Sequence, residues 1–319
     1  MIAALCRISN LCGSWLQPRH TVCNSAAALA ADAWVICPSR RITLIARALL
    51  LCALSALAPV SVRAWGANAD RLIATRAIDT LPPEIRAFFD ANREFILRHV
   101  TDPLTALETN PKTEAPNHII YLDHYGAFPF TALPRDYRAA LAKFGRPKLE
   151  SAGLLPWQIG LVSQRLTEAL RSGNWEQVRL LAASLAGYVA QAHDPFNTTE
   201  DFDGHISGQP GINLRFSTNL VERYSLFFPM HPNDAAYIYD PTDHAFESCF
   251  NAHAWLENIF LADRRARAGL TDYTDDYYDR FYNQAGAILI RQLSDAATDI
   301  GSYWLTSWVN AGRPAFPRQ

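Results

Sequence analysis

The sequence has little cysteine once its first 64 residues are set aside. Five of the six cysteines lie in that segment, and Cys249 is the only one that follows. A single thiol cannot close an internal disulfide bond, so the later part of the chain must rely on a hydrophobic core for its stability. The 319 residues are 49% apolar and 19% charged, which is ordinary for a globular protein with a sizeable core.

The first 64 residues also contain only one acidic side chain, that of Asp32. Basic residues within 40–47 precede an apolar run over 48–60, and Val62-Arg63-Ala64 then has small or aliphatic residues where a signal peptidase reads the chain. A buried core helix would also be apolar, but the basic flank and the cleavage-like end favour export. We therefore predict a signal over residues 1–64, cleavage after Ala64, and a periplasmic or secreted protein.

The part that remains after this cleavage has no surplus of positive charge. Loss of the leader's six arginines and one aspartate leaves 23 basic and 30 acidic residues. Nonspecific binding to nucleic acid or to anionic lipid needs a basic surface, so the balance argues against both. The apolar run of the leader is shorter than the roughly 20 residues of a membrane span, and no transmembrane anchor is expected after its removal. A phosphate-cradling glycine loop is also missing.

Alternation of apolar and polar residues with period two is scarce, which argues against strands. The spacing is helical almost throughout. Leu81-Pro82-Pro83-Glu84 is a helix start signal, because proline is tolerated in a first turn. Proline and glycine concentrate between the segments, and no linker divides the chain. We predict a single all-α domain over residues 65–319, with further helices at 157–170, 175–193, 213–227, 245–262 and 277–309.

Several short motifs occur in a fixed order along this domain. They are Trp65-Gly66, 81–85, Val100-Thr101-Asp102-Pro103, 114–125, 185–204, Arg215-Phe216, 220–224, Ala262-Asp263-Arg264, and 303–314. Together these motifs resemble the zinc-dependent phospholipase C and single-strand-specific nuclease superfamily. The resemblance implies a helical domain with three zinc ions in a cleft and phosphate-ester hydrolysis by a metal-bound hydroxide.

Four of the nine metal-binding positions that the resemblance implies still carry a possible ligand. The N-terminal tryptophan, which binds through its amine and carbonyl, matches Trp65, and the predicted cleavage would expose that amine. The position of a histidine five residues later holds Asp70, which has oxygen ligands. Asp102 and His118 match a carboxylate and a histidine of the family. Asp102 also suits a turn before proline, and His118 is expected to form hydrogen bonds rather than to bind metal without its partners.

The other five positions are unsuited to zinc. Gly187 and Gln191 occupy the places of a histidine and an aspartate, and the i, i+4 spacing puts both on one helix face. Asn197 replaces the histidine after the His-x-Pro turn. Asn213 and Ser217 replace a histidine and a carboxylate of the next helix. An alternative register would use Arg215 and Asn219, which are no better as zinc ligands.

No site for three zinc ions can be assembled from these residues. One metal would lose its entire protein shell, a second would keep Asp102 and His118 but lose both partners on the helix, and the third would lose its bridging carboxylate. Our leading hypothesis is a noncatalytic domain that binds an unidentified small ligand or protein partner and holds no zinc, or one zinc ion weakly. The competing hypothesis is a zinc-dependent phosphodiesterase, either a phospholipase or a nuclease, with a reduced or rewired site built on Trp65, Asp102 and His118.

Other polar residues have simpler explanations. His193 precedes Asp194-Pro195 and suits a helix C-terminal cap. Asp201, Asp203 and His205 lie close together in a loop, where they would recruit a different cation or form solvated turns; the second is the expectation.

Cys249 and His253 share one helix face, as a nucleophile and its base would. A reactive cysteine needs an exposed, electropositive surrounding. The apolar neighbours Phe246, Phe250 and Leu256 predict burial instead.

Overall fold

The computed structural model describes residues 65–317. The predicted signal, residues 1–64, lies outside the described residues, as do residues 318–319. Within 65–317 the secondary structure is helical without a strand, and these residues form a compact helical domain, which confirms the all-α prediction. No helix in this part of the chain is both long enough and apolar enough to span a bilayer.

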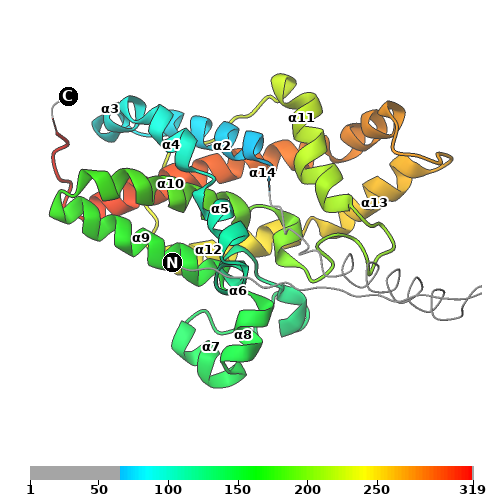
Figure 1. Ribbon diagram of the computed structural model, residues 1–319, viewed down its shortest axis with the longest axis horizontal. Coiled ribbons are helices and arrows are strands. Elements are labelled where there is room, and N and C mark those ends of the chain that lie inside the picture. The colour runs from blue at the N-terminus through cyan, green and yellow to red at the C-terminus, as the bar shows by residue number, and fades with distance from the viewer. Residues whose placement is uncertain (1–64, 318–319) are drawn as a thin grey trace, which may run out of the picture. The chain divides into compact units, whose positions relative to one another are not determined.

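The first half of the domain consists of short helices connected by turns (Figure 1). Pro83 begins one of them, as the double-proline start signal predicts. These elements are α2 (Ala67–Asp79), α3 (Pro83–Ala91), α4 (Arg93–His99), α5 (Asp102–Thr109), α6 (Pro111–Glu114), the 3-10 turns η1 (Ala115–His118) and η2 (Leu122–Tyr125), α7 (Tyr137–Phe144) and α8 (Arg146–Ala152).

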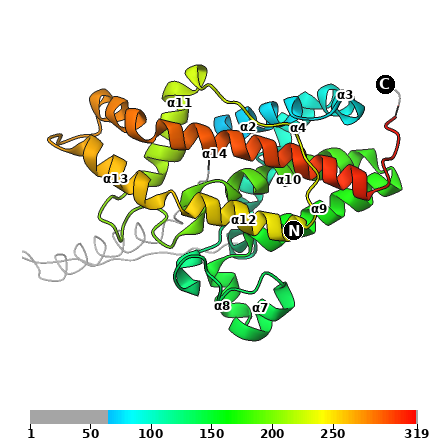
Figure 2. The same ribbon diagram turned by 180° about the vertical axis from the view of Figure 1, so that it is seen from behind.

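The second half contains the long helices, and α14 runs in front of the others along most of the domain in the view of Figure 2. Short turns η3, η4 and η5 separate the long helices in the middle of this half. In chain order the elements are α9 (Leu155–Ser172), α10 (Trp175–Ala192), η3 (Pro195–Thr198), η4 (Leu214–Asn219), α11 (Leu220–Tyr224), η5 (Ser225–Phe227), α12 (Pro241–His253), α13 (Leu256–Arg267) and α14 (Asp275–Asn310).

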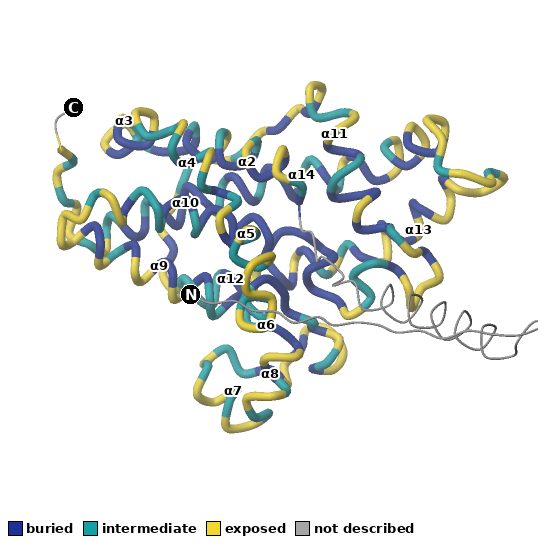
Figure 3. Tube along the Cα trace, viewed as in Figure 1, coloured by how far each residue is buried: buried dark blue, intermediate teal, exposed yellow. Residues whose placement is uncertain are grey.

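Helix α10 lies at the centre of the domain. It packs against α9, α14, α4, α5 and α2, and Figure 3 shows its trace as buried toward its C-terminal end. Gly173 ends α9 in the left-handed conformation that glycine adopts without steric cost. The Asn174 side chain then accepts the backbone N–H of Gln177 and caps α10. This tight turn sets α9 antiparallel beside α10.

Two tryptophans, one before α10 in the sequence and one long after it, donate hydrogen bonds to backbone carbonyl groups of this helix. Trp65 donates its indole N–H to the Ala190 carbonyl oxygen at 2.7 Å. Trp304 on α14 donates to the Ala182 carbonyl oxygen at 3.0 Å and stacks on Phe89 with ring centroids 4.5 Å apart. Both indoles are fully buried, so each combines apolar burial with a satisfied polar group.

Two of the predicted helices are interrupted. The segment predicted as one helix over 245–262 is two helices, because a tight turn at Ala254–Trp255 separates α12 from α13. No proline or glycine marks this break, so the local sequence gives no sign of it. The segment 213–227 is helical, but it combines the π-helical η4 with α11 and the 3-10 turn η5. The C-terminal helix α14 begins two residues before its predicted start and ends one residue after its predicted end.

Candidate functional site

The C-terminal end of α10 and the turn that follows are completely enclosed. Every residue from Leu185 to Thr199 is buried. The Asp194 carboxylate accepts the backbone N–H of Phe196 at 3.0 Å and starts η3. Within this stretch, Asn197 donates its side-chain amide to the Gln191 carbonyl oxygen at 3.0 Å. The sequence motif at 185–204 is therefore an internal turn rather than the exposed wall of a cleft.

The start of α2 packs onto this turn. Trp65 bonds the last turn of α10, and its ring lies 6.3 Å from that of Phe216 on η4. Asp70 follows on the first turn of α2 and is 1% exposed. The charge of Asp194 is one of the causes that raise the pKa of Asp70, so the two carboxyl groups are neighbours. Segments 125 residues apart in sequence thus meet at the positions that the resemblance nominated.

His118 meets Gln191 although 73 residues separate them. The His118 Nδ1 atom lies 2.6 Å from Gln191 Oε1, and its Nε2 atom lies 3.2 Å from Glu114 Oε1. Glu114 also accepts the hydroxyl proton of Tyr188. Both ring nitrogens of His118 are therefore engaged by other side chains, and the ring is 2% exposed.

The two alternative residue pairs of the η4 segment have different neighbours. Arg215 pairs with the buried Asp263, and Asn219 donates to the Tyr278 hydroxyl at 2.7 Å. Ser217 instead lies beside the Asp194 carboxyl group. Asn213 lies four residues before Ser217, about one turn of the π-helical segment. Arg215 and Asn219 thus have partners on α13 and α14, whereas Ser217 lies at the α10 turn.

Asp70 and Asp194 are carboxyl groups in a low-dielectric interior. Burial and the charge of Asp194 raise the pKa of Asp70 well above its usual value, and Arg71 opposes this only in part. Burial also raises the pKa of Asp194 to about 7, and the hydrogen bond from the Phe196 N–H and the nearby Ser217 hydroxyl oppose this shift only in part. Ionising either group inside the domain is thus costly.

Two of the positions that the resemblance nominated do not join this cluster. Asp102 lies at the surface, where its carboxylate is 2.8 Å from His99 Nδ1 and its side chain is 48% exposed. Gly187 lies against the Val100 carbonyl oxygen, which a Cβ atom would meet at 2.5 Å, and against Pro103. The segment that carries Asp102 therefore fills the space of a side chain at position 187.

The residues at this site do not fit zinc. Within 65–317 no group of three or more His, Cys, Asp or Glu side chains is arranged to hold a metal ion. His118 is the one histidine at the nominated positions, and both of its ring nitrogens already have partners. The remaining side chains around Asp70 and Asp194 offer oxygen atoms, whereas zinc sites are built mainly from histidine nitrogen and cysteine sulfur.

The other polar residues that the sequence singled out lie elsewhere. His205 Nε2 is 3.2 Å from Asp203 in an exposed loop. Asp201 accepts the backbone N–H groups of Ile206 and Ser207, as a turn residue does. Cys249 is fully buried, and burial raises the pKa of its thiol, so it does not supply a thiolate.

A second buried polar cluster escaped the sequence reasoning. His193 Nε2 is 2.9 Å from Asp299 Oδ2 on α14, and His244 Nε2 is 2.9 Å from the other oxygen. Ser248 donates to the same carboxylate at 2.8 Å. The i, i+4 spacing of His244 and Ser248 was the available signal, but nothing local points to Asp299. His193 is thus a structural partner of α14 in addition to capping α10.

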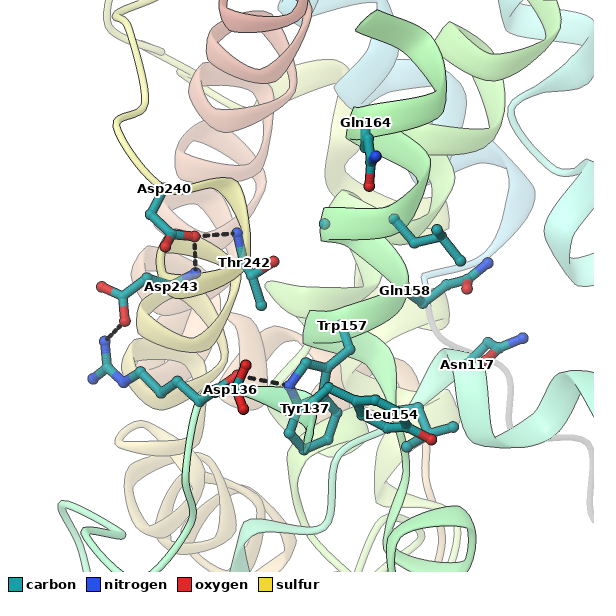
Figure 4. Close-up of a pocket in the computed structure, with 13 residues that line it drawn as sticks. Asn117, Asp136, Tyr137, Leu154, Trp157, Gln158, Gln164, Asp240, Thr242 and Asp243 are labelled. Atoms are coloured by element: carbon teal, nitrogen blue, oxygen red, sulfur yellow. Dashed lines mark hydrogen bonds and ion pairs between the residues drawn. The ribbon is translucent and has the colours of Figure 1, made fainter. Parts of the chain in front are cut away.

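Two surface cavities lie apart from the buried turn. The first has a volume of about 660 Å³ and lies between α9, the start of α12 and the segment before α7 (Figure 4). The second, of about 650 Å³, is formed by the 199–207 loop and the α12–α13 junction. The side chains labelled in Figure 4 are Asn117, Asp136, Tyr137, Leu154, Trp157, Gln158, Gln164, Asp240, Thr242 and Asp243.

Polar side chains share the wall of the first cavity with apolar ones, and its one cationic side chain is already paired. Arg135 contacts Asp243 and lies 2.5 Å from Glu247. Asp240 and Asp136 each cap a helix and keep a second oxygen for other contacts. Asn117 at the rim donates to Glu114 at 3.2 Å. Since Glu114 also contacts His118, hydrogen bonds connect this cavity with the buried turn.

Comparison with known proteins adds no family. No family model matches the chain, and no curated protein is significantly similar to it. The functional argument therefore rests on the geometry of these residues.

Gly187→Ala tests how tightly position 187 is closed. The added methyl group would meet a backbone oxygen, so α10 and the segment at Val100 must separate. We expect the free energy of unfolding to fall by about 1–3 kcal/mol, despite alanine's higher helix propensity. Denaturant titration measures this. Gly286→Ala is the control, because its methyl group would meet only the ring of Tyr282, which can rotate; an equal loss in both variants would contradict the tight contact at 187.

The Asp299 cluster predicts a pH dependence of stability. Burial alone would lower the pKa of His244, but the Asp299 carboxylate beside it raises that pKa above its usual value. Because the pKa of His244 is higher in the folded protein, the His244–Asp299 pair stabilises the fold fully at pH values below the unfolded-state pKa of about 6.5. This stabilisation is lost as the pH rises through the folded-state pKa of His244. We expect the melting temperature to fall above about pH 6.5, and His244→Gln to flatten that fall.

The Asp299 carboxylate predicts a second loss of stability, at low pH. Burial would raise the pKa of Asp299, but hydrogen bonds from His193 and His244 hold it well below its ordinary range. Asp299 therefore stabilises the fold fully at pH values above the unfolded-state pKa of about 4, and this stabilisation is lost as the pH falls further. Melting curves across this range measure both losses of stability. The exposed His231→Gln variant should retain the wild-type profile; a flat wild-type profile above neutrality would contradict the assignment.

Proposed function

We propose that this chain is an exported, noncatalytic member of the zinc-dependent phospholipase C and nuclease superfamily, which binds a small ligand or a partner instead of hydrolysing phosphate esters. The observation that carries the proposal is the contact between His118 and Gln191, with both nitrogens of the ring engaged. His118 matches a metal ligand of the family, and Gln191 stands where the family has another. The two side chains form a hydrogen bond with each other, which occupies a nitrogen atom that would otherwise bind metal.

The convergence of distant positions supports the family part of the proposal. Trp65 reaches α10 across 125 residues, and Asp70 and Ser217 both lie beside Asp194. Unrelated helical domains would not be expected to bring these same positions to one turn. Asp102 is the exception, since it pairs with His99 at the surface.

The burial of the turn supports the noncatalytic part. A metal-bound hydroxide must reach its substrate, so an active site of this kind needs an open cavity. Trp65, Asn197 and Ser217 are fully buried, and Gly187 is closed by the backbone at Val100. The side chains that replaced the ligands fill the interior instead of lining a cleft.

The cavity of about 660 Å³ between α9 and α12 is the best candidate for the binding site. Its volume lies in the range of about 300–1,000 Å³ that small-molecule sites have. Trp157, Tyr137 and Leu154 provide an apolar wall, and carboxylates outnumber the single paired Arg135. The chemistry favours a small polar ligand that is neutral or positively charged over an anionic one.

Metal content tests the noncatalytic proposal. We expect the purified protein to contain well under one equivalent of zinc by elemental analysis, because the ligands that zinc prefers are missing. Zinc should not stimulate hydrolysis of bis(p-nitrophenyl) phosphate. His118→Gln serves as the matched control, and it should leave the zinc content unchanged. Two or three tightly held zinc ions, or zinc lost in this variant, would establish the competing hydrolase with a rewired site.

The position of the mature N-terminus tests export. N-terminal sequencing of the protein recovered from the periplasm or medium should begin at Trp65. Ala64→Arg should block processing, because a signal peptidase requires a small residue before the cleaved bond. A mature chain that retains residues before Trp65 would show that this part of the proposal is wrong.

A further inference from the structure

Five buried side chains at the α10 turn each carry an oxygen atom that makes no hydrogen bond within the protein. All five residues are less than 5% exposed. Buried polar atoms almost always have a partner, so several in one place indicate that something else engages them. The atoms are Asp70 Oδ1, Asp194 Oδ2, Asn197 Oδ1, Asn213 Oδ1 and Ser217 Oγ.

The five residues come from three segments that meet at the α10 turn, as the Trp65–Ala190 hydrogen bond and the contact between the rings of Phe196 and Phe216 show. Asp194 is close enough to Asp70 to raise its pKa, and Ser217 lies beside Asp194. Asn197 follows three residues after Asp194, and its backbone N–H donates to the Asp194 carbonyl oxygen at 3.1 Å. Asn213 lies one turn before Ser217 on the same segment. Each of three segments supplies at least one of the five side chains: the start of α2, the end of α10 with η3, and the η4 segment.

The cluster contains two buried carboxyl groups, and neither has a cationic partner. No basic side chain in the part of the chain that the structure describes forms an ion pair with Asp70 or Asp194, unlike the buried Asp263, which pairs with Arg215 at 3.1 Å. Arg215, the nearest arginine in sequence to Ser217, is held by Asp263 and Tyr277. A buried carboxylate without a partner is costly, so an external cation would be stabilised here.

We propose that Asp70, Asp194, Asn197, Asn213 and Ser217 form a binding site for a hard divalent cation, and that calcium is the ion that fits best. The proposal goes beyond the noncatalytic function and shares with it only the absence of a zinc ligand set. A bound ion would join α2, the α10 turn and η4, so its role is structural.

The donor atoms select the ion. Calcium takes six to eight oxygen ligands from carboxylates and amide carbonyls in flexible geometry. Magnesium demands regular octahedral geometry and retains several waters, which suits a fully enclosed site less well. Zinc and other transition metals favour nitrogen or sulfur donors, which the five residues do not supply. Two carboxylates balance the charge of one divalent ion.

Terbium luminescence provides a direct test, because terbium(III) replaces calcium at oxygen sites and is sensitised by a nearby indole. Trp65 adjoins the α2 end of the cluster, and its ring lies 6.3 Å from Phe216, the neighbour of Ser217. With protein stripped of metal by a chelator, we expect saturable terbium emission excited through tryptophan. Calcium should displace the terbium and raise the melting temperature, and magnesium should be less effective.

Asp194→Asn is the decisive variant. It removes a negative charge but retains the carbonyl oxygen that accepts the Phe196 N–H, so the turn should still form. We expect calcium affinity to fall about tenfold or more, since ligand charge sets affinity at such sites. Asp295→Asn, at a partly exposed position on α14, is the matched control and should bind as the wild type does.

Two results would overturn the proposal. One is the absence of saturable terbium emission together with a melting temperature that calcium does not change. The other is calcium binding that Asp194→Asn and Asp295→Asn weaken equally, which would indicate surface charge rather than this cluster. If Asp194→Asn does not fold, Asp70→Asn provides the same comparison. Zinc content decides the noncatalytic function separately, because a protein without zinc satisfies that proposal whether or not calcium binds.

Discussion

The complete burial of residues 185–199 is the constraint on which the rest of the structure depends. A helix end normally has carbonyl and N–H groups that water satisfies. Here water has no access, so each group needs a partner inside the protein. The Trp65 indole, the Asn197 amide and the Asp194 carboxylate meet this need at successive points of the turn. Trp65 is therefore part of the core, although 125 residues separate it from Ala190 in sequence.

The same burial explains the chemistry that the site allows. A buried histidine needs a partner for each ring nitrogen, as His118 has in Gln191 and Glu114. Asparagine and serine are neutral, and the side-chain oxygens of Asn197, Asn213 and Ser217 make no hydrogen bond within the protein. The two carboxyl groups beside them, Asp70 and Asp194, resist ionisation. The interior at this turn therefore offers oxygen atoms rather than nitrogen ligands.

The fold was largely predictable from periodicity, and the enclosure of the site was not. Helical spacing predicted α9, α10 and α14 because each buries a continuous apolar face. The break at Ala254–Trp255 had no signal, because it arises from packing rather than from a breaking residue. The spacing of Gly187 and Gln191 placed both on one face of α10. It could not reveal that the Val100 carbonyl covers one of them, because that contact joins helices that are distant in sequence.

The Asp299 cluster was missed for a similar reason. His193, His244 and Asp299 come from three helices, and each is unremarkable in its own segment. Such a group becomes visible only when the helices are placed side by side.

The contact at Gly187 has a consequence for how this chain can vary. Any side chain added at that position would meet the Val100 carbonyl oxygen, and Pro103 lies just beyond it. A larger residue would therefore need the Val100 segment to move first. A single substitution at 187 is harmful unless a second change has already displaced that segment, so the order in which substitutions arise decides which of them this fold can accept.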